Sequence, residues 1–419
     1  MDSVRNMPEF LELLPPVEAL ELLLKNLPEK YQKFERVSTL EALGRVVSKP
    51  VIAPEDLPAF PRSTVDGYAV RASDTFGASD TFPMYLSLVG EVPMGRAPGF
   101  KILPGQAGLI HTGGMLPDGS DAVVMLETVQ NAGPGEVEVL KSVAVGENIL
   151  RPGEDVRKGD KLLTAGMRLR PAEIGGLLGL GLLEVEVAVR PKVGILSSGD
   201  EVVPPQVVPA PGQVRDINSY TLSALVAEHG AEPQFYGIVP DRLQDLRVYL
   251  KKALAECDLV VITAGSSAST RDLTASVIQE IGAPGVLVHG VNVKPGKPTI
   301  LAVCDGKAVI GLPGNPVSAL VIAGIFVVPV IERLLGMTRD RPHSAISARL
   351  TTNLSSQAGR EDWVPVRLVL TADGYLADPI FYKSNLIFSL SKADGLVHIP
   401  ASANGLPVGE MVDVELLSL

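Results

Sequence analysis

The chain has 419 residues, too many for one compact hydrophobic core, so two to four domains are expected. Its composition is that of a globular protein, 46% hydrophobic and 20% charged, and its formal net charge is −11. This acidic balance argues against nucleic acid or an anionic membrane surface as the main partner. Cys257 and Cys304 lie in apolar stretches and are expected to be buried free thiols in a reducing compartment.

The N-terminal third predicts a helical segment followed by a β domain. Its first residues carry acids and prolines where a secretory signal would carry basic and then apolar residues, so a cytoplasmic location is expected. Helical spacing predicts helices over residues 16–26 and 38–48. Residues 51–150 hold short apolar runs interrupted by Gly and Pro, which is typical of a small all-β domain. A Gly-rich apolar helix is expected within residues 151–190, which with residues 1–50 would form a helical linking segment.

Residues 191–340 alternate apolar strands with amphipathic helices, which predicts a parallel sheet covered by helices on both faces. Strands are expected at 192–198, 233–239 and 258–265, and helices at 218–230, 241–256, 272–282 and 315–336. Asn218 is expected to cap the first of these helices. The apolar run 317–331 within the last helix is expected to be too short to cross a bilayer. Residues 341–419 return to short strands and are interpreted as a β-barrel or sandwich.

The segment KPGKPTILAVCDGKAVIGLPGNPVSA, residues 294–319, contains two corners stiffened by Pro and Gly around a hairpin. Lys294 and Lys297 belong to the first corner, and Pro313 and Pro316 to the second. A rigid backbone has few states to lose, so such corners suit a surface that is shaped before its ligand arrives. Two ordinary tight turns would explain the same residues without a ligand.

Ligands of open α/β sheets bind beyond the carboxyl ends of the strands, and acidic residues follow those ends here. These residues are Asp200, Glu201, Asp241 and Asp272. The loop TAGSSASTRD, which ends at Asp272, is rich in small residues that expose backbone N–H groups to an oxyanion. Acids and lysines around one anion suggest a mediating divalent cation, and Mg²⁺ held by carboxylates and substrate phosphate is the economical choice. Helix caps and solvated loop charges are the alternative interpretation of these acids.

Six motifs in fixed order resemble those of the molybdopterin molybdenumtransferase family. They are TVDGYAV (64–70), HTGGMLPDGSDAVVMLE (111–127), RPGEDV (151–156), SSGDEVV (197–203), VKPGKP (293–298) and GLPGNPVSA (311–319). The resemblance runs from the first predicted helix to the C-terminus, and the E domain of gephyrin shares the same layout. It implies an elongated homodimer of four-domain subunits, whose α/β domain is related to molybdopterin adenylyltransferases.

The resemblance also implies an activity, the last step of molybdenum-cofactor synthesis. Molybdenum from molybdate is inserted into adenylylated molybdopterin, with Mg²⁺-dependent release of AMP, at a site between the α/β domain of one subunit and domains of the other. By motif, substrate-binding roles fall to Thr112, Asp155, Ser266, Ser267, Lys294, Lys297, Pro313, Pro316 and Arg360. Catalytic roles fall to Asp66, Glu201, Asp241 and Asp272, and the last three of these are the expected Mg²⁺ ligands.

Some residues of these motifs have simpler explanations. Asp66 could serve only as an Asp-Gly turn, and Arg360 could form a surface ion pair with its acidic neighbours. The loop that usually resembles TGGVSxGxxD has Ser266 and Thr270 at two glycine positions, which leaves open a changed nucleotide or oxyanion preference. Two other functions compete with the transferase: a protein-binding scaffold of the gephyrin type and a nucleotide hydrolase. The VDGYA and HTGG motifs of the β domain argue against the hydrolase.

Overall fold

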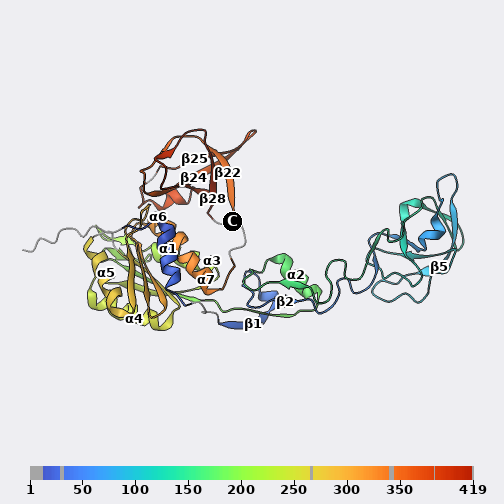
Figure 1. The fold of residues 1–419 in the computed structure, drawn as a ribbon, viewed down its shortest axis with the longest axis horizontal. Helices are drawn as coiled ribbons and strands as arrows, with labels where there is room; N and C mark the ends of the chain where they lie inside the picture. Colours follow the sequence, from blue (N-terminus) through green and yellow to red (C-terminus); the bar gives the residue numbers. More distant parts are fainter. Residues whose placement is uncertain (1–12, 29–32, 265–267, 339–343, 382, 418–419) are drawn as a thin grey trace, which may run out of the picture.

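A computed structural model of the chain describes residues 13–28, 33–264, 268–338, 344–381 and 383–417. The described molecule is elongated (Figure 1). An α/β unit and a C-terminal barrel lie together at one end, and the small β domain lies at the other. A slender segment made from two separate parts of the chain connects the ends, as the multidomain interpretation of the sequence requires.

Helix α1 (Pro16–Lys25) lies where the sequence predicts a helix, with Ala19 and Leu23 fully buried against the α/β core. The helix predicted over 38–48 is wrong. Strand β1 (Phe34–Ser38) and one turn of 3₁₀-helix, η1 (Thr39–Glu41), occupy its beginning, and the chain then extends. The helix fails because Gly44 takes a left-handed conformation (φ 74°), and β1 pairs with a strand far along the sequence.

The linking segment combines helix α2 with short antiparallel ladders. The prediction of a Gly-rich helix is right for α2 (Pro171–Gly179), but the following EVEVA sequence forms strand β12 (Glu184–Ala188), which pairs with β1. Alternation of acidic and apolar residues explains that strand. The other ladders join β2 (Val51–Ile52) to β11 (Lys161–Leu163) and β3 (Arg62–Ser63) to β10 (Ile149–Leu150).

The small β domain is a mixed sheet with the strand order β7-β4-β6-β5-β9-β8. Its elements are β4 (Gly67–Val70), η2 (Ala72–Thr75), β5 (Met84–Glu91), β6 (Gln106–Ile110), β7 (Ala122–Met125), η3 (Leu126–Thr128), β8 (Val129–Gly133) and β9 (Glu136–Val139). Gly67, which follows Asp66, is required by close packing: a Cβ there would lie 2.0 Å from the carbonyl oxygen of Val124 on the neighbouring strand.

The α/β unit contains a sheet with the strand order β16-β13-β17-β21-β20-β18. Its strands are β13 (Lys192–Ser198), β16 (Glu232–Val239), β17 (Leu259–Ala264), β18 (Pro284–His289), β20 (Ile300–Cys304) and β21 (Lys307–Pro313), and a separate ladder joins β14 (Val202–Val203) to β15 (Val214–Arg215). Strands β16, β13, β17 and β21 are parallel, whereas β20 and β18 add an antiparallel edge. The expected hairpin is β20–β21, which turns through Asp305 and Gly306, both with positive φ.

Helices cover both faces of this sheet, as predicted. They are α3 (Asn218–Glu228), α4 (Leu243–Glu256), α5 (Ala268–Ile281), α6 (Pro316–Ile322), the π-helical segment η4 (Ala323–Val327) and α7 (Val328–Leu334). A hydrophobic core lies on each face of the sheet, and the side chains of β13 alternate between the two. Val193 and Ile195 pack with α3 and α6 on one face, and Leu196 packs with α4 on the other. The sequence alternation therefore determines which helix covers which face.

The two thiols lie in this unit, and both cysteines are buried and free, as predicted. Burial raises the pKa of the Cys257 thiol and raises that of Cys304 to about 11. Both thiols therefore stay protonated at neutral pH, where a protonated thiol is a poor nucleophile.

The run from α6 to α7 is the one helix among the described residues that could cross a membrane by length and composition. Pro316–Leu334 has 19 residues and a mean hydropathy of 2.1, so the expectation that this run is too short is wrong on length. However, 61% of it is buried, and Phe326 and Ile331 are fully inside the α/β core. Its apolar composition is thus explained by its position in the core.

Helix α3 is not capped by the predicted residue. Asn218 is already helical, and its Nδ2 donates a hydrogen bond to the carbonyl oxygen of Gly314 at 2.9 Å. Asp216 supplies the cap instead, because its Oδ1 accepts from the backbone N–H of Ser219 at 3.1 Å. Asn218 thereby ties α3 to the second proline-rich corner.

We expect Asp216→Ala to lower the free energy of unfolding by about 0.5–2 kcal/mol, because α3 loses its N-terminal acceptor. Urea unfolding followed by circular dichroism measures the effect. Asp80→Ala, at an exposed loop acid of the small β domain, is the control and should change stability by less than about 0.5 kcal/mol. Equal urea midpoints for Asp216→Ala and the unsubstituted protein would contradict the capping role.

The C-terminal strands close into a barrel, which decides between the two predicted alternatives. The barrel strands are β22 (Ala345–Leu350), β24 (Glu361–Thr371), β25 (Gly374–Pro379), β26 (Gly395–Ile399) and β28 (Met411–Leu416). Closure follows because β24 pairs with both β25 and β26, while β22 and β28 complete the circuit. The remaining elements are the ladder of β23 (Leu354–Ser355) with β27 (Gly405–Leu406), and α8 (Ile387–Leu390).

One strand of the α/β unit also joins the barrel sheet. Strand β19 (Val293–Lys294), in the first proline-rich corner, pairs in parallel with the start of β24. The corner that carries the two lysines is therefore hydrogen-bonded to the C-terminal domain.

Candidate active site

A pocket of about 470 Å³ lies between the α/β unit and the barrel. The α/β unit contributes Lys294, Lys297 and Pro313, and the barrel contributes Arg360. Four predicted site residues from three distant parts of the sequence thus line one pocket. Other lining residues were not predicted from the sequence, among them Ser318, Asp362, Trp363 and Ser384.

The lysine corner is held in shape by packing and hydrogen bonds. Gly296 has φ 118°, and a Cβ there would lie 2.2 Å from Cγ1 of Ile322 on α6, so the corner rests directly on that helix. The hydroxyl of Thr299 donates to the carbonyl oxygen of Gly296 at 2.6 Å, and the N–H of Val291 donates to that of Lys297 at 2.9 Å. These contacts support the predicted rigid corner.

The second corner has a different arrangement from the one predicted. Pro313 ends β21 and lines the pocket, whereas Pro316 does not: it begins α6, where a missing N–H costs nothing. Asn315 Nδ2 donates to Ser384 Oγ at 3.0 Å, which leaves the serine hydroxyl hydrogen free to donate to another acceptor. The corner therefore helps to orient a hydroxyl in the pocket wall.

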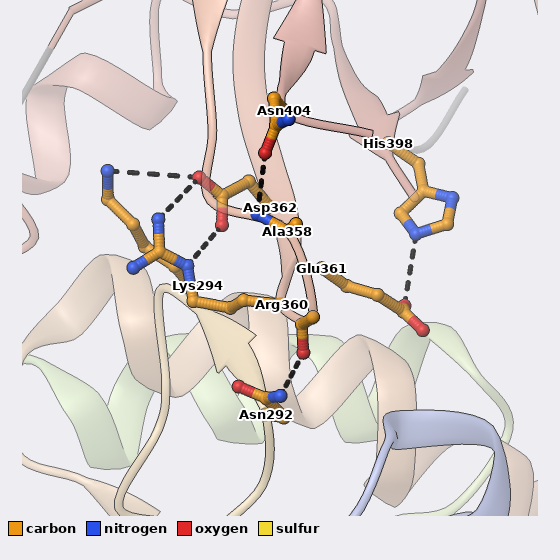
Figure 2. Close-up of polar contacts among 9 residues, drawn as sticks. Asn292, Lys294, Ala358, Arg360, Glu361, Asp362, His398 and Asn404 are labelled. Atoms are coloured by element: carbon orange, nitrogen blue, oxygen red, sulfur yellow. Dashed lines mark hydrogen bonds and ion pairs between the residues drawn. The ribbon is translucent and has the colours of Figure 1, made fainter. Parts of the chain in front are cut away.

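Positive charge is in excess around the pocket (Figure 2). Arg360 donates from Nε and Nη2 to the two carboxylate oxygens of Asp362 at 2.7 and 3.0 Å, and Lys294 Nζ lies 3.9 Å from Asp362 Oδ2. Lys297 is exposed and forms no ion pair with any residue that the structure describes. The lining residues include three cations and one carboxylate, with serine hydroxyls nearby, a set that favours binding of a small anion.

The predicted acids form a second cluster at the ends of β13 and β16. Ser198 Oγ donates to Asp241 Oδ1, and the backbone N–H of Asp241 lies 3.4 Å from Asp200 Oδ1. Glu201 is exposed in the same turn, and its carboxylate lies over Gly199. Three of the four predicted acids are thus close in space.

The fourth acid cannot be placed in this cluster. The side chain of Asp272 lies outside the described residues, as do Ser266 and Ser267. The backbone does correct one expectation: α5 begins at Ala268, so Asp272 lies inside the helix and does not begin it.

The acid cluster and the pocket with its lysine corner lie along one edge of the sheet. The ends of β16 and β13 carry the acids, and the end of β21 carries Pro313, with β17 between. Neighbouring strands are about 4.8 Å apart, which places the acids roughly 10–15 Å from Pro313 and roughly 15–20 Å from the lysine corner that leads into β20. The described acids and lysines therefore do not surround one anion: they form two subsites suited to an extended ligand.

The acid cluster suits Mg²⁺, which commonly uses one or two carboxylates and completes its coordination with water and phosphate oxygens. Asp200 and Asp241 provide such carboxylates beside the Ser198 hydroxyl. No group of three or more acidic, His or Cys side chains in the described part of the chain is arranged to hold a metal by itself. Phosphate oxygens of a substrate would have to complete the coordination.

Asp66 and Thr112 meet in the small β domain. Asp66 Oδ1 accepts from the Thr112 backbone N–H at 2.7 Å and from its hydroxyl at 3.1 Å. The amide hydrogen bond, and then the hydroxyl, lower the pKa of Asp66 below its usual range, so the carboxylate is ionised at neutral pH. His111 Nδ1 lies 3.8 Å from the same oxygen, and His111 Nε2 lies 2.9 Å from Glu91 Oε1. Neither His111 nor Glu91 was predicted from the sequence as a site residue.

These residues belong to the small β domain, which lies at the opposite end of the molecule from the α/β unit and the barrel that form the pocket (Figure 1). Asp155 is exposed and lies between β10 and β11, which pair with β3 and β2 of the linking segment. If Asp66, Thr112 and Asp155 act together with the pocket, they must come from a second copy of the chain.

Comparison with known proteins agrees with this architecture. Three family models match in order: MoeA N-terminal region (domain I and II) over residues 14–181, Probable molybdopterin binding domain over residues 194–333, and MoeA C-terminal region (domain IV) over residues 347–417. Together they span the linking segment, the small β domain, the α/β unit and the barrel.

Individual relatives match along nearly the whole chain. A protein of Methanocaldococcus jannaschii named for molybdopterin biosynthesis is 37% identical over 417 residues, 97% of this chain and 98% of the relative. The molybdopterin molybdenumtransferase of Nostoc sp. is 34% identical over 416 residues, covering 97% and 94%. A crystal structure of the molybdopterin biosynthesis MoeA protein of Pyrococcus horikoshii OT3 matches with a TM-score of 0.83 and 34% identity, covering 97% of this chain and 100% of that chain.

The multidomain fold and these relatives define an enzyme of molybdenum-cofactor biosynthesis. The chain belongs to the molybdopterin molybdenumtransferase family. The resemblance inferred from the six motifs is confirmed.

Proposed function

We propose that this protein inserts molybdenum from molybdate into adenylylated molybdopterin and releases AMP in a Mg²⁺-dependent reaction. The observation that carries the proposal is the pocket itself, in which Lys294, Lys297 and Arg360 converge from two domains. Molybdate is a small tetrahedral dianion, the kind of ligand that this excess of positive charge and the serine hydroxyls would bind.

The lysines would supply much of the attraction. Unit charges roughly 4 Å apart attract by roughly 4 kcal/mol at an effective dielectric constant of 20, and less when fully solvated. Because packing on α6 fixes the corner, less of this attraction is lost in ordering the backbone. Tungstate has the same shape and charge, so the pocket would bind it by the same contacts.

The acid cluster would serve the nucleotide half of the substrate. Asp200 and Asp241, with Glu201 beside them, would hold Mg²⁺ against the phosphate oxygens. The bound cation would neutralise phosphate charge and make AMP a better leaving group. Ser198 orients the Asp241 carboxylate through its hydrogen bond. A ligand reaching from these acids to the lysines has the extended form of an adenylylated pterin.

A complete site would require a homodimer. The protein would act in the cytoplasm. The separation of Asp66 and Thr112 from the pocket in one chain supports the dimer. In the dimer, the small β domain and Asp155 of one subunit would face the α/β unit of the other.

Purified protein given adenylylated molybdopterin, molybdate and Mg²⁺ is expected to release AMP and to form active molybdenum cofactor. Chromatography measures AMP, and reconstitution of a molybdenum-dependent apoenzyme measures the cofactor. Omission of molybdate or of Mg²⁺ should each prevent product formation. Substrate binding without AMP release under complete conditions would contradict the proposal and favour a scaffold function.

A further inference from the structure

A buried carboxylate stands in the wall of the pocket. The Asp362 side chain is 4% exposed, and its two oxygens face Arg360 and Lys294 (Figure 2). A negative charge beside an anion subsite repels the anion, so this acid weakens binding unless it does something that outweighs the repulsion.

Backbone pairing fixes Asp362 relative to the lysine corner. Asp362 lies directly opposite Lys294 in the parallel pairing of β24 with β19. The N–H of Glu361 donates to the carbonyl oxygen of Asn292 at 3.1 Å, and the Asn292 side chain donates to the carbonyl oxygen of Gly359. Asp362 therefore cannot shift without moving the corner.

The carboxylate also fixes the guanidinium plane. Two N–H groups of Arg360, on Nε and Nη2, are used by the two oxygens of Asp362. A guanidinium has five such donors in one plane, so the others are directed by the fork–fork contact and can be offered to the pocket. Without Asp362, Arg360 would have to order itself on the anion at an entropic cost.

We propose that Asp362 is a positioning residue for the oxyanion: it orients Arg360 and Lys294, and this orientation outweighs its own repulsion of the anion. The inference rests on the proposed function in one respect, that the pocket binds molybdate. The proposal predicts a change in anion affinity that is opposite in sign to the one expected from charge repulsion alone. Removing a negative charge next to an anion site should tighten binding by Coulomb's law alone, whereas loss of positioning should weaken it.

The test is equilibrium binding of molybdate to the full-length protein, measured by isothermal titration calorimetry. Asp362→Asn keeps the shape and removes the charge, and we expect it to weaken binding about tenfold, the difference between a charged and a neutral hydrogen-bonded pair. Asp378→Asn is the matched control. Asp378 also pairs with an arginine of the barrel, Arg367 at 3.3 Å, but does not line the pocket, and binding should not change.

A double-mutant cycle with Arg360→Gln separates positioning from general damage to the fold. If Asp362 acts through Arg360, the loss caused by Asp362→Asn should largely disappear in the Arg360→Gln background. An equal loss in both backgrounds, or molybdate binding by Asp362→Asn as tight as in the unsubstituted protein or tighter, would overturn the inference. Failure of the unsubstituted protein to bind molybdate would instead overturn the proposed function.

A structure of the unsubstituted protein with molybdate gives a test that does not depend on folding of the variant. Arg360 should keep both hydrogen bonds to Asp362 while another of its N–H groups contacts the oxyanion. An Arg360 that leaves Asp362 to reach the anion would refute the positioning role.

Discussion

Replacing Lys297 with alanine is expected to lower kcat/KM for molybdate by about 100-fold, or nearly 3 kcal/mol, with little loss of stability. The lysine is exposed and forms no ion pair with a described residue, so the fold does not depend on its charge. Its position on the pocket rim makes that charge available to a ligand. The initial rate of AMP release, measured over a series of molybdate concentrations, should show mainly a raised KM.

The control for this variant is Lys251→Ala, which removes an exposed lysine from α4 and should leave the kinetics unchanged. Thermal unfolding should show the same midpoint for both variants. An unchanged KM for molybdate in Lys297→Ala would exclude this lysine from the oxyanion subsite. A large drop in the unfolding midpoint would show that the lysine has a structural role.

Combining two impaired variants in one dimer is expected to restore activity at a molybdate concentration well below the KM of Lys297→Ala. Asp66→Ala affects only the small β domain, and Lys297→Ala affects only the pocket at the other end of the same chain. If the site combines both regions from different subunits, half of randomly formed dimers are mixed. Each of these has one intact site of two, so about a quarter of full activity should return in the unseparated mixture and about half in isolated mixed dimers.

Co-expression of the two variants with different affinity tags, followed by purification through both tags, isolates the mixed dimers for the AMP assay. The control pairs Lys294→Ala with Lys297→Ala, which damage the same region, so every site in that mixture stays defective. Equal activity in the two mixtures would contradict a site shared between subunits.

The sequence predicts the fold best where a local pattern agrees with distant contacts. Alternation in β13 and the amphipathic helices of the α/β unit led to the right layers, because each residue faces the core that its polarity suits. Residues 38–48 have helical spacing, yet β1 pairs with β12, and Val46 and Val47 form bridges to Arg168 and Val187. Such long-range pairing overrides local preference and has no local signal.

The residues of the candidate site also differ in whether a local sequence pattern predicts them. Lys294, Lys297, Pro313 and Arg360 were found because each belongs to a short motif, and the structure brings them to one pocket. Asp362 and Ser384 were missed, since their positions depend on domain packing. For Asp362, the one available signal was its place beside Arg360, which favoured a surface ion pair. Burial at 4% exposure corrects that interpretation.

The pairing of β19 with β24 has a consequence for the order in which a new molecule matures. During synthesis the lysine corner leaves the ribosome well before β24, so the α/β unit can fold while this edge still lacks its partner. Arg360 arrives only with the final domain. The nascent chain would therefore complete the proposed oxyanion site last, and a molecule truncated before β24 would keep its acid cluster while lacking the pocket residues that the barrel contributes.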